Sequence, residues 1–150
     1  MSKLMPAAER LALTLWVGAQ WAIGYIAAPT LFATLDDRQL AGDLAGRMFH
    51  AVYILGMIAG ILLLALLWRS WSARRWRLWA LVAMVAFTAV GLFVLQPMMA
   101  DIKARGMAPG SDLEATFGML HGVSSILYLA VSLLGAVLVA VGLRPQSDGE

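Results

Sequence analysis

The chain has 150 residues, of which 61% are hydrophobic and only 13% charged, with a net charge of +2 and no cysteine. A soluble domain carries roughly 25% charged residues. This chain therefore has more apolar surface than a small globule buries, and lipid is the expected solvent for much of it. The lack of cysteine excludes disulfides, zinc–thiolate sites and thiol nucleophiles. The basic residues gather at the ends of apolar segments and not on one face, which argues against a nucleic-acid partner.

The first apolar segment covers about residues 11–35 and is long enough to span a bilayer with some tilt. The alternative is a secretory signal peptide, whose apolar part is about 7–15 residues long and ends at a small-residue cleavage site. The segment here is longer, carries Trp16 and Trp21, and has Pro29 near its end. These features favour a membrane span.

A polar stretch, residues 36–47, leads into the second apolar segment, which covers about residues 48–68. Leucines four residues apart in the polar stretch are typical of an amphipathic helix. We expect this stretch to extend the second helix toward its N-terminus. Asp36 or Asp37 is the expected cap, because aspartate accepts hydrogen bonds from the free amides of a first helical turn.

An arginine-rich loop, residues 69–77, connects the second segment to the third, which covers about residues 78–100. Arginines flanked by tryptophans, with no acid among them, are typical of the cytoplasmic edge of a membrane. After a second polar loop, Ser111 and Glu114 have the spacing of a capping box. A fourth span is therefore predicted over about residues 113–143.

The sequence thus predicts an all-α polytopic membrane protein, in which residues 1–150 form a single domain, a four-transmembrane-helix bundle with both termini cytoplasmic. The orientation follows from the positive-inside rule, which counts basic residues. The termini and the arginine-rich loop together carry Lys3, Arg10, Arg69, Arg74, Arg75, Arg77 and Arg144, whereas the other two loops carry Arg38, Arg47, Lys103 and Arg105. The predicted location is the inner (plasma) membrane of a bacterium.

The two helical hairpins expected from these spans resemble each other. Pro29 and Pro97 lie near the outer ends of the first and third spans, and His50 and His121 lie in the first turns of the second and fourth. Both hairpins would start on the same side, so a symmetry axis would run along the membrane normal. Duplication is one explanation. The alternative is that short outer connections favour prolines and polar helix starts.

Polar side chains within the spans predict a cluster that is open to the outer side. The two histidines are joined in it by Gln20, Tyr53, Gln96, Ser124 and Ser125. His50 and Tyr53 are three residues apart and share a helix face, as do His121 and Ser124. Polar groups within a membrane usually face the bundle interior, which brings these two faces together.

The two histidines, His50 and His121, admit several interpretations. As cofactor-binding residues they could hold haem b axially, in an electron carrier. As metal ligands they could help to bind copper or zinc, since neutral imidazole is a common ligand. They could also line a path for a small molecule or ion. The simplest interpretation is that each bonds a carbonyl or a serine across a helix interface. The sequence requires neither haem nor metal.

No enzyme is predicted. The acids lie in loops, so no Ser–His–Asp arrangement and no carboxylate pair forms within a span. There is no phosphate-binding loop and no dinucleotide-binding motif. Ser124 or Ser125 could approach His50 as a dyad, but no loop for an oxyanion hole is evident.

Three sequence blocks carry a family resemblance: APTLF from Ala28, AGDLAGRMFHAVY from Ala41, and FGMLHGVSSILY from Phe117. With these blocks the chain resembles bacterial members of the transmembrane-protein-205-like family, small four-span proteins with a domain of unknown function. The resemblance covers nearly the whole chain except the termini and the arginine-rich loop. It implies a multi-pass membrane protein without established catalysis.

The first hypothesis is an uncharacterised, non-enzymatic membrane protein whose outward-facing polar cluster handles a small molecule or metal ion. The second is a haem-b-binding electron carrier. The third is a structural accessory subunit in the lipid bilayer, which packs against other membrane proteins or a second copy. Its packing glycines would be Gly42, Gly46, Gly56, Gly60, Gly118 and Gly122.

Overall fold

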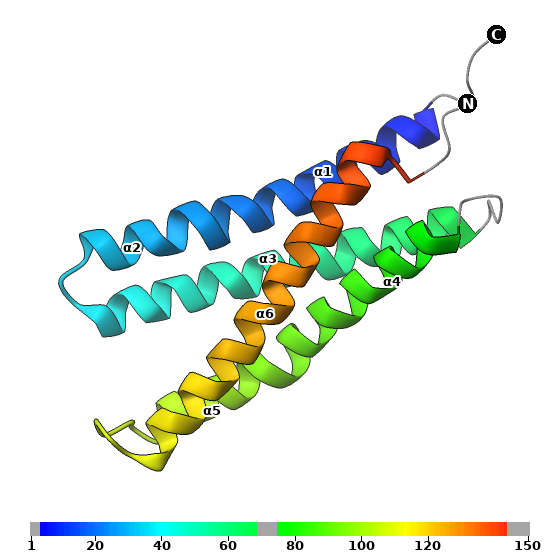
Figure 1. The fold of residues 1–150 in the computed structure, drawn as a ribbon. Coiled ribbons are helices and arrows are strands. Elements are labelled where there is room, and N and C mark those ends of the chain that lie inside the picture. The colour runs from blue at the N-terminus through cyan, green and yellow to red at the C-terminus, as the bar shows by residue number, and fades with distance from the viewer. Residues whose placement is uncertain (1–3, 69–74, 144–150) are drawn as a thin grey trace, which may run out of the picture.

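The computed structural model describes residues 4–68 and 75–143, in which all regular secondary structure is helical (Figure 1). In chain order the elements are α1 (Leu4–Trp21), the π-helix η1 (Ala22–Ala27), α2 (Ala28–Thr34), α3 (Arg38–Trp68), α4 (Arg75–Val90), the π-helix η2 (Gly91–Leu95), α5 (Gln96–Ala104) and α6 (Asp112–Val141). Four continuous helices are long and apolar enough to cross a membrane: Met5–Thr34, Arg38–Leu67, Arg75–Ala104 and Asp112–Val141. The predicted all-α membrane bundle is confirmed.

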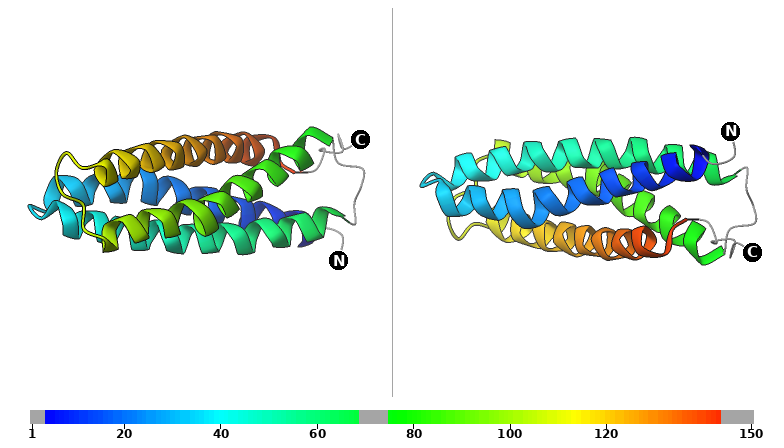
Figure 2. Two further views of the ribbon diagram at one scale, coloured as in Figure 1. Left: turned by 90° about the horizontal axis from the view of Figure 1, so that it is seen from below. Right: turned by 90° about the horizontal axis from the view of Figure 1, so that it is seen from above.

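The four spans lie side by side and run alternately up and down (Figure 2). The α2–α3 and α5–α6 connections share one end, which we call the hairpin end. The start of α1 and the end of α6 lie at the other, which we call the terminal end (Figure 1). α1 packs on α3 and α6, and α4 packs on the same two helices. Each first helix of a hairpin therefore touches both second helices.

Both expected helix starts at the hairpin end are confirmed. Asp37 Oδ1 accepts hydrogen bonds from the amides of Gln39 (2.8 Å) and Leu40 (3.0 Å), so the polar stretch does extend α3. Ser111 Oγ accepts from the Glu114 amide at 3.2 Å, as in a capping box. The carboxylate of Glu114 differs from that motif, because it accepts from the amide of Gly110 at 2.6 Å instead of the cap residue.

The first and third spans are longer than predicted, and the first begins at Leu4 instead of about residue 11. Residues 75–77 were expected in the arginine-rich loop but form the first turn of α4. α5 continues past the expected end of the third span at residue 100 to Ala104. Polar residues are good helix formers at the ends of a span, where water and headgroups solvate them. Residues 69–74 of the predicted loop lie outside the described residues.

The core of the terminal half contains one leucine from each span: Leu13, Leu63, Leu81 and Leu138. Each is at most 2% exposed, and we call these four residues the leucine layer. The core cluster to which they belong contains only hydrophobic side chains. The layer separates the polar side chains of the hairpin half from those of the terminal end.

The two hairpins bury side chains at the same intervals. The buried residues on α1 include Glu9, Leu13, Trp16 and Gln20, and those on α4 are Arg77, Leu81, Met84 and Thr88. The buried residues on α3 include Tyr53, Gly56, Gly60 and Leu63, and those on α6 include Tyr128, Val131, Gly135 and Leu138, with the same spacing. The arrangement is an approximate two-fold repeat of hairpins. Its origin by duplication stays a prediction.

Candidate functional site

Polar side chains connect neighbouring helices at four levels, from the hairpin end to the middle of the bundle. We call these contacts the polar ladder. Its rungs are Asp43–Lys103, His50–Gln96, Tyr53–Ser124 and Gln20–Tyr128–Ser132. With a rise of about 1.5 Å per residue, the first three rungs span about 15 Å along α3. The ladder becomes more buried with depth, so its outer rungs are the ones that a ligand can reach.

The outermost rung joins α5 to α3 and α6. Lys103 Nζ lies 3.0 Å from Asp43 Oδ1 and donates to the carbonyl oxygen of Gly42 at 3.4 Å. The same ammonium lies 5.8 Å from the centre of the Phe117 ring. Both charged side chains are partly exposed, and such pairs contribute little to stability. These contacts hold the Lys103 ammonium in place at the edge of the site.

The second rung orients His50. Its Nδ1 lies 2.7 Å from Oε1 of Gln96, across the interface between α3 and α5. An amide oxygen only accepts hydrogen bonds, so the neutral tautomer that fits this contact has its proton on Nδ1 and a lone pair on Nε2. The residue is exposed. His50 therefore presents a basic nitrogen held in a fixed orientation.

His121 does not join this rung. Its ring stacks on Phe117 of the same helix, with centroids 6.3 Å apart, and its carbonyl oxygen accepts the hydroxyl of Ser125 at 2.8 Å. Both His121 and Ser125 are exposed. The structure thus brings five of the predicted site residues into the ladder and leaves these two on the surface of α6.

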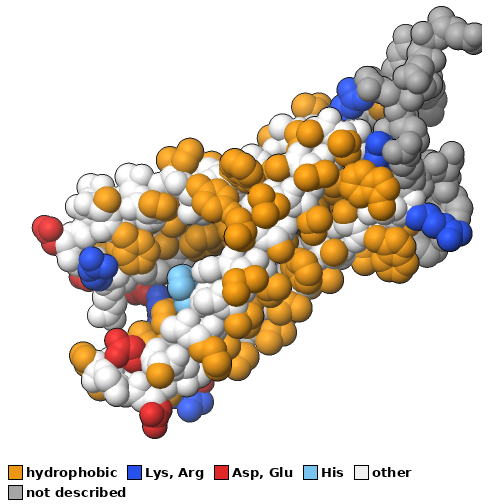
Figure 3. All heavy atoms as spheres, viewed as in Figure 1, with side chains coloured by type: hydrophobic (Ala, Val, Ile, Leu, Met, Phe, Trp, Pro, Cys, Tyr) orange, Lys and Arg blue, Asp and Glu red, His pale blue; other side chains and the backbone are white. Residues whose placement is uncertain are grey.

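The hairpins part at this end and leave a notch between their tips (Figure 3). Histidine is visible at the inner end of the notch, and acidic and basic side chains lie around its rim (Figure 3). Lys103 and Asp43 form an ion pair between the two hairpins. The notch is consequently the polar, accessible mouth of the ladder.

The third and fourth rungs lie deeper. Tyr53 and Ser124 approach each other with their hydroxyl oxygens 3.4 Å apart. Gln20, only 3% exposed, donates through Nε2 to the carbonyl oxygen of Tyr128 at 3.1 Å and to Ser132 Oγ at 3.3 Å. Ser132 was missed in the sequence, although it lies one helical turn beyond Tyr128, where a polar residue in an apolar span indicates an interhelical bond.

Tyr128 interrupts the hydrogen bonding of the first span. Its hydroxyl donates to the carbonyl oxygen of Gln20 and also bonds the backbone of Gly24. In an unbroken α-helix these two backbone groups would pair with each other. A side chain that inserts between them opens the turn, and η1 begins at Ala22. A Cβ at Gly24 would overlap the tyrosine ring, so glycine is required there.

The second hairpin repeats this arrangement. Gly91 opens η2, and a Cβ built on it would lie 2.8 Å from ring atoms of Tyr53. Pro29 follows η1 and Pro97 follows η2, each in the first turn of the next helix. Proline lacks an N–H and clashes with the carbonyl four residues earlier, which the wider π turn relieves. Each hairpin thus places a tyrosine against the π turn of the other.

Two buried charges at the terminal end were predicted only as parts of polar segments. Glu9 and Arg77 occupy equivalent positions on α1 and α4, one turn beyond Leu13 and Leu81 of the leucine layer. The sequence could have indicated that these two charges are buried, because each lies four residues before a buried leucine and residues four apart share a helix face. They lie on the opposite side of the leucine layer from the polar ladder.

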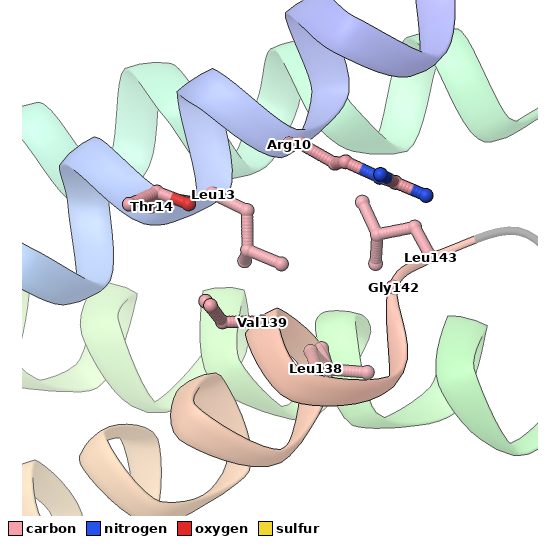
Figure 4. A pocket seen from close by; sticks show the side chains of 7 residues that line it. All are labelled: Arg10, Leu13, Thr14, Leu138, Val139, Gly142 and Leu143. Atoms are coloured by element: carbon pink, nitrogen blue, oxygen red, sulfur yellow. The ribbon is translucent and has the colours of Figure 1, made fainter.

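Two cavities lie away from the ladder. One, of about 90 Å³, lies between α1 and α6 at the terminal end and is bounded by Arg10, Leu13 and Leu143 among others (Figure 4). The other is an open apolar groove of about 290 Å³ between the first span and α3, with Ala19, Ala22 and Ala51 on its wall. Neither contains a rung of the ladder.

Within residues 4–68 and 75–143, no three histidine, aspartate or glutamate side chains gather into a group that could hold a metal ion. Haem and metal binding by His50 and His121 stay predictions. The proposed packing glycines divide into two sets. A Cβ on Gly56 or Gly60 would meet Trp16, and one on Gly42 would touch Lys103 and Phe32. Among the described residues, a Cβ on Gly46, Gly118 or Gly122 would have no neighbour within 4 Å. An accessory-subunit role stays a prediction as well.

Four apolar spans around a polar ladder define a multi-pass α-helical membrane protein. The sequence model of one family matches residues 11–108, and the chain belongs to that family, described as a domain of unknown function, DUF4149. No curated protein and no solved structure matches the chain. The comparison supports the expected domain of unknown function and does not extend to the transmembrane-protein-205-like family.

Proposed function

We propose that the chain is a non-enzymatic membrane protein that binds a small polar molecule or metal ion in the notch, with His50 as the principal contact. The observation that carries this proposal is the bond from His50 Nδ1 to Gln96, which leaves Nε2 free and oriented. Histidines that bind metals commonly hold their second nitrogen in this way. The same nitrogen accepts a hydrogen bond from an N–H or O–H group of an organic ligand.

The rest of the notch supports a small, polar ligand. Lys103 and Asp43 supply one charge of each sign at its rim, 3.0 Å apart. Gln96 and Ser124 add neutral hydrogen-bonding groups in the next two rungs of the ladder. Haem fits less well, because the His121 ring lies against Phe117 and not opposite His50. A cation or a hydrogen-bond donor of few atoms matches these groups best.

The proposal is tested with zinc as the probe. We expect purified protein in mild detergent to bind Zn²⁺ in a calorimetric titration, and Gln96→Leu to weaken binding about 10–100-fold, the usual effect of removing such an orienting partner. His50→Ala should abolish it. Ser125→Ala is the matched control, since Ser125 lies outside the ladder.

Two further results decide between the interpretations. A visible spectrum with a haem Soret band that is lost in both His50→Ala and His121→Ala would favour the electron carrier. If wild-type protein binds zinc no more tightly than His50→Ala, the metal form of the proposal fails. Binding of an organic ligand through Nε2 then requires the His50 imidazole ¹⁵N signals to show a proton on Nδ1. This version of the proposal fails if they show the proton on Nε2.

For the orientation we propose the cytoplasm at the terminal end and the outer side at the hairpin end, in a bacterial plasma membrane. The distribution of arginine and lysine supports it. Because the chain has no cysteine, single cysteines report position without background. We expect Ala108→Cys to react with an impermeant maleimide in intact spheroplasts, and Ser72→Cys to react only after permeabilisation. The reverse pattern would invert the topology.

A further inference from the structure

We infer that Arg77 holds a phosphate-type oxyanion at the terminal end of the bundle, and that this site is separate from the notch. Arg77 is 8% exposed, and within the described residues its Nε and Nη1 atoms have no hydrogen-bond partner. A buried N–H group without a partner is unfavourable, and more so on a charged group. The guanidinium plane presents its donors as a fork that matches two oxygens of a phosphate.

The position of Arg77 on its helix adds a second attraction for an anion. It is the third residue of α4, Arg75–Val90. Side chains on a helix lean toward its N-terminus, which directs Arg77 over the first turn. The amides of that turn have no acceptor within the helix, and the helix dipole is positive there. Glu9, the buried acid at the equivalent position of α1, accepts a hydrogen bond from neither Nε nor Nη1 of Arg77.

Tryptophans place this site at headgroup depth. Trp76 and Trp79 are exposed, and the Arg77 guanidinium carbon lies 5.6 Å from the centre of the Trp76 ring. Tryptophan is enriched at the membrane–water interface. The phosphate of a phospholipid lies at this depth, and free inorganic phosphate offers the same oxygens. Both sources satisfy the chemistry, and they are distinguished by experiment.

The test measures the melting temperature of the full chain in detergent while a probe is titrated. The probes are phosphatidylglycerol, a neutral glycolipid without phosphate, and inorganic phosphate. We expect phosphatidylglycerol to stabilise the wild type more than the glycolipid does. Arg77→Gln should raise the half-saturating concentration roughly tenfold or more, since bonds to a charged group are strong. Arg75→Gln, two residues away and exposed, is the matched control.

The results of this titration distinguish a phospholipid headgroup from free inorganic phosphate as the source of the oxyanion. Stabilisation by phosphatidylglycerol alone supports a lipid-headgroup site, and stabilisation by phosphate as well supports a site for free oxyanions. If Arg77→Gln does not fold, Arg77→Lys keeps the charge without the fork and should show the same weakening. The inference is overturned if neither phosphate-containing probe exceeds the glycolipid, or if the Arg77 and Arg75 variants respond alike. Zinc binding in the notch is unaffected by either result.

Discussion

Trp16→Ala is expected to destabilise the bundle by about 3–5 kcal/mol, the usual cost of removing a buried tryptophan. The side chain is 1% exposed and belongs to the core cluster of the leucine layer. Its indole lies where a Cβ at Gly56 or Gly60 would be, so these glycines leave no atom that could fill the space. The measurement is the free energy of unfolding in lipid bicelles.

Trp79→Ala is the control for this prediction. Trp79 is 67% exposed, and exposed substitutions usually change stability by less than about 0.5 kcal/mol. Both variants lose the same indole, so hydrophobicity alone would give equal effects. Equal losses would mean that Trp16 faces lipid, and that the helix packing described above is wrong.

Gly24→Ala is expected to destabilise the protein by about 1–3 kcal/mol, the range for overpacking a filled core. The new Cβ would overlap the ring of Tyr128. It would also push the hydroxyl of Tyr128 out of its place between Gln20 and Gly24. Thermal unfolding in detergent measures the effect.

Gly18→Ala, six residues earlier on the same span, should stabilise the protein, which is the opposite of the effect expected for Gly24→Ala. Nothing lies within 4 Å of a Cβ at Gly18, and alanine is favoured over glycine in a helix by about 1 kcal/mol. A pair of variants with opposite signs identifies the ring of Tyr128 as the cause. If Gly24→Ala also stabilises, Tyr128 does not occupy the π turn.

Much of the fold was predictable because the signals are local. Apolar length defined four spans, and Asp37 and Ser111 marked two helix starts that the structure confirms. The π turns were not predictable, because their cause is a contact over a long sequence distance. Nothing near Gly24 in the sequence indicates that Tyr128 will insert there.

The candidate site was predictable in part for the same reason. Polar residues inside apolar spans are conspicuous, and five of the predicted residues do meet in the ladder. The pairing of His50 with Gln96 instead of His121 depends on how α3 and α5 are rotated, which spacing along one helix does not determine. The buried state of Arg77 was missed because charges near a span end usually reach solvent.

The leucine layer has a consequence for permeation. The fourth rung of the ladder ends at Gln20, and beyond it lie Leu13, Leu63, Leu81 and Leu138, one from every span. Both hairpins contribute leucines to this layer, and a polar solute would lose its hydrogen bonds on passing it. The polar ladder is therefore not continued toward the terminal end by polar side chains of this core cluster.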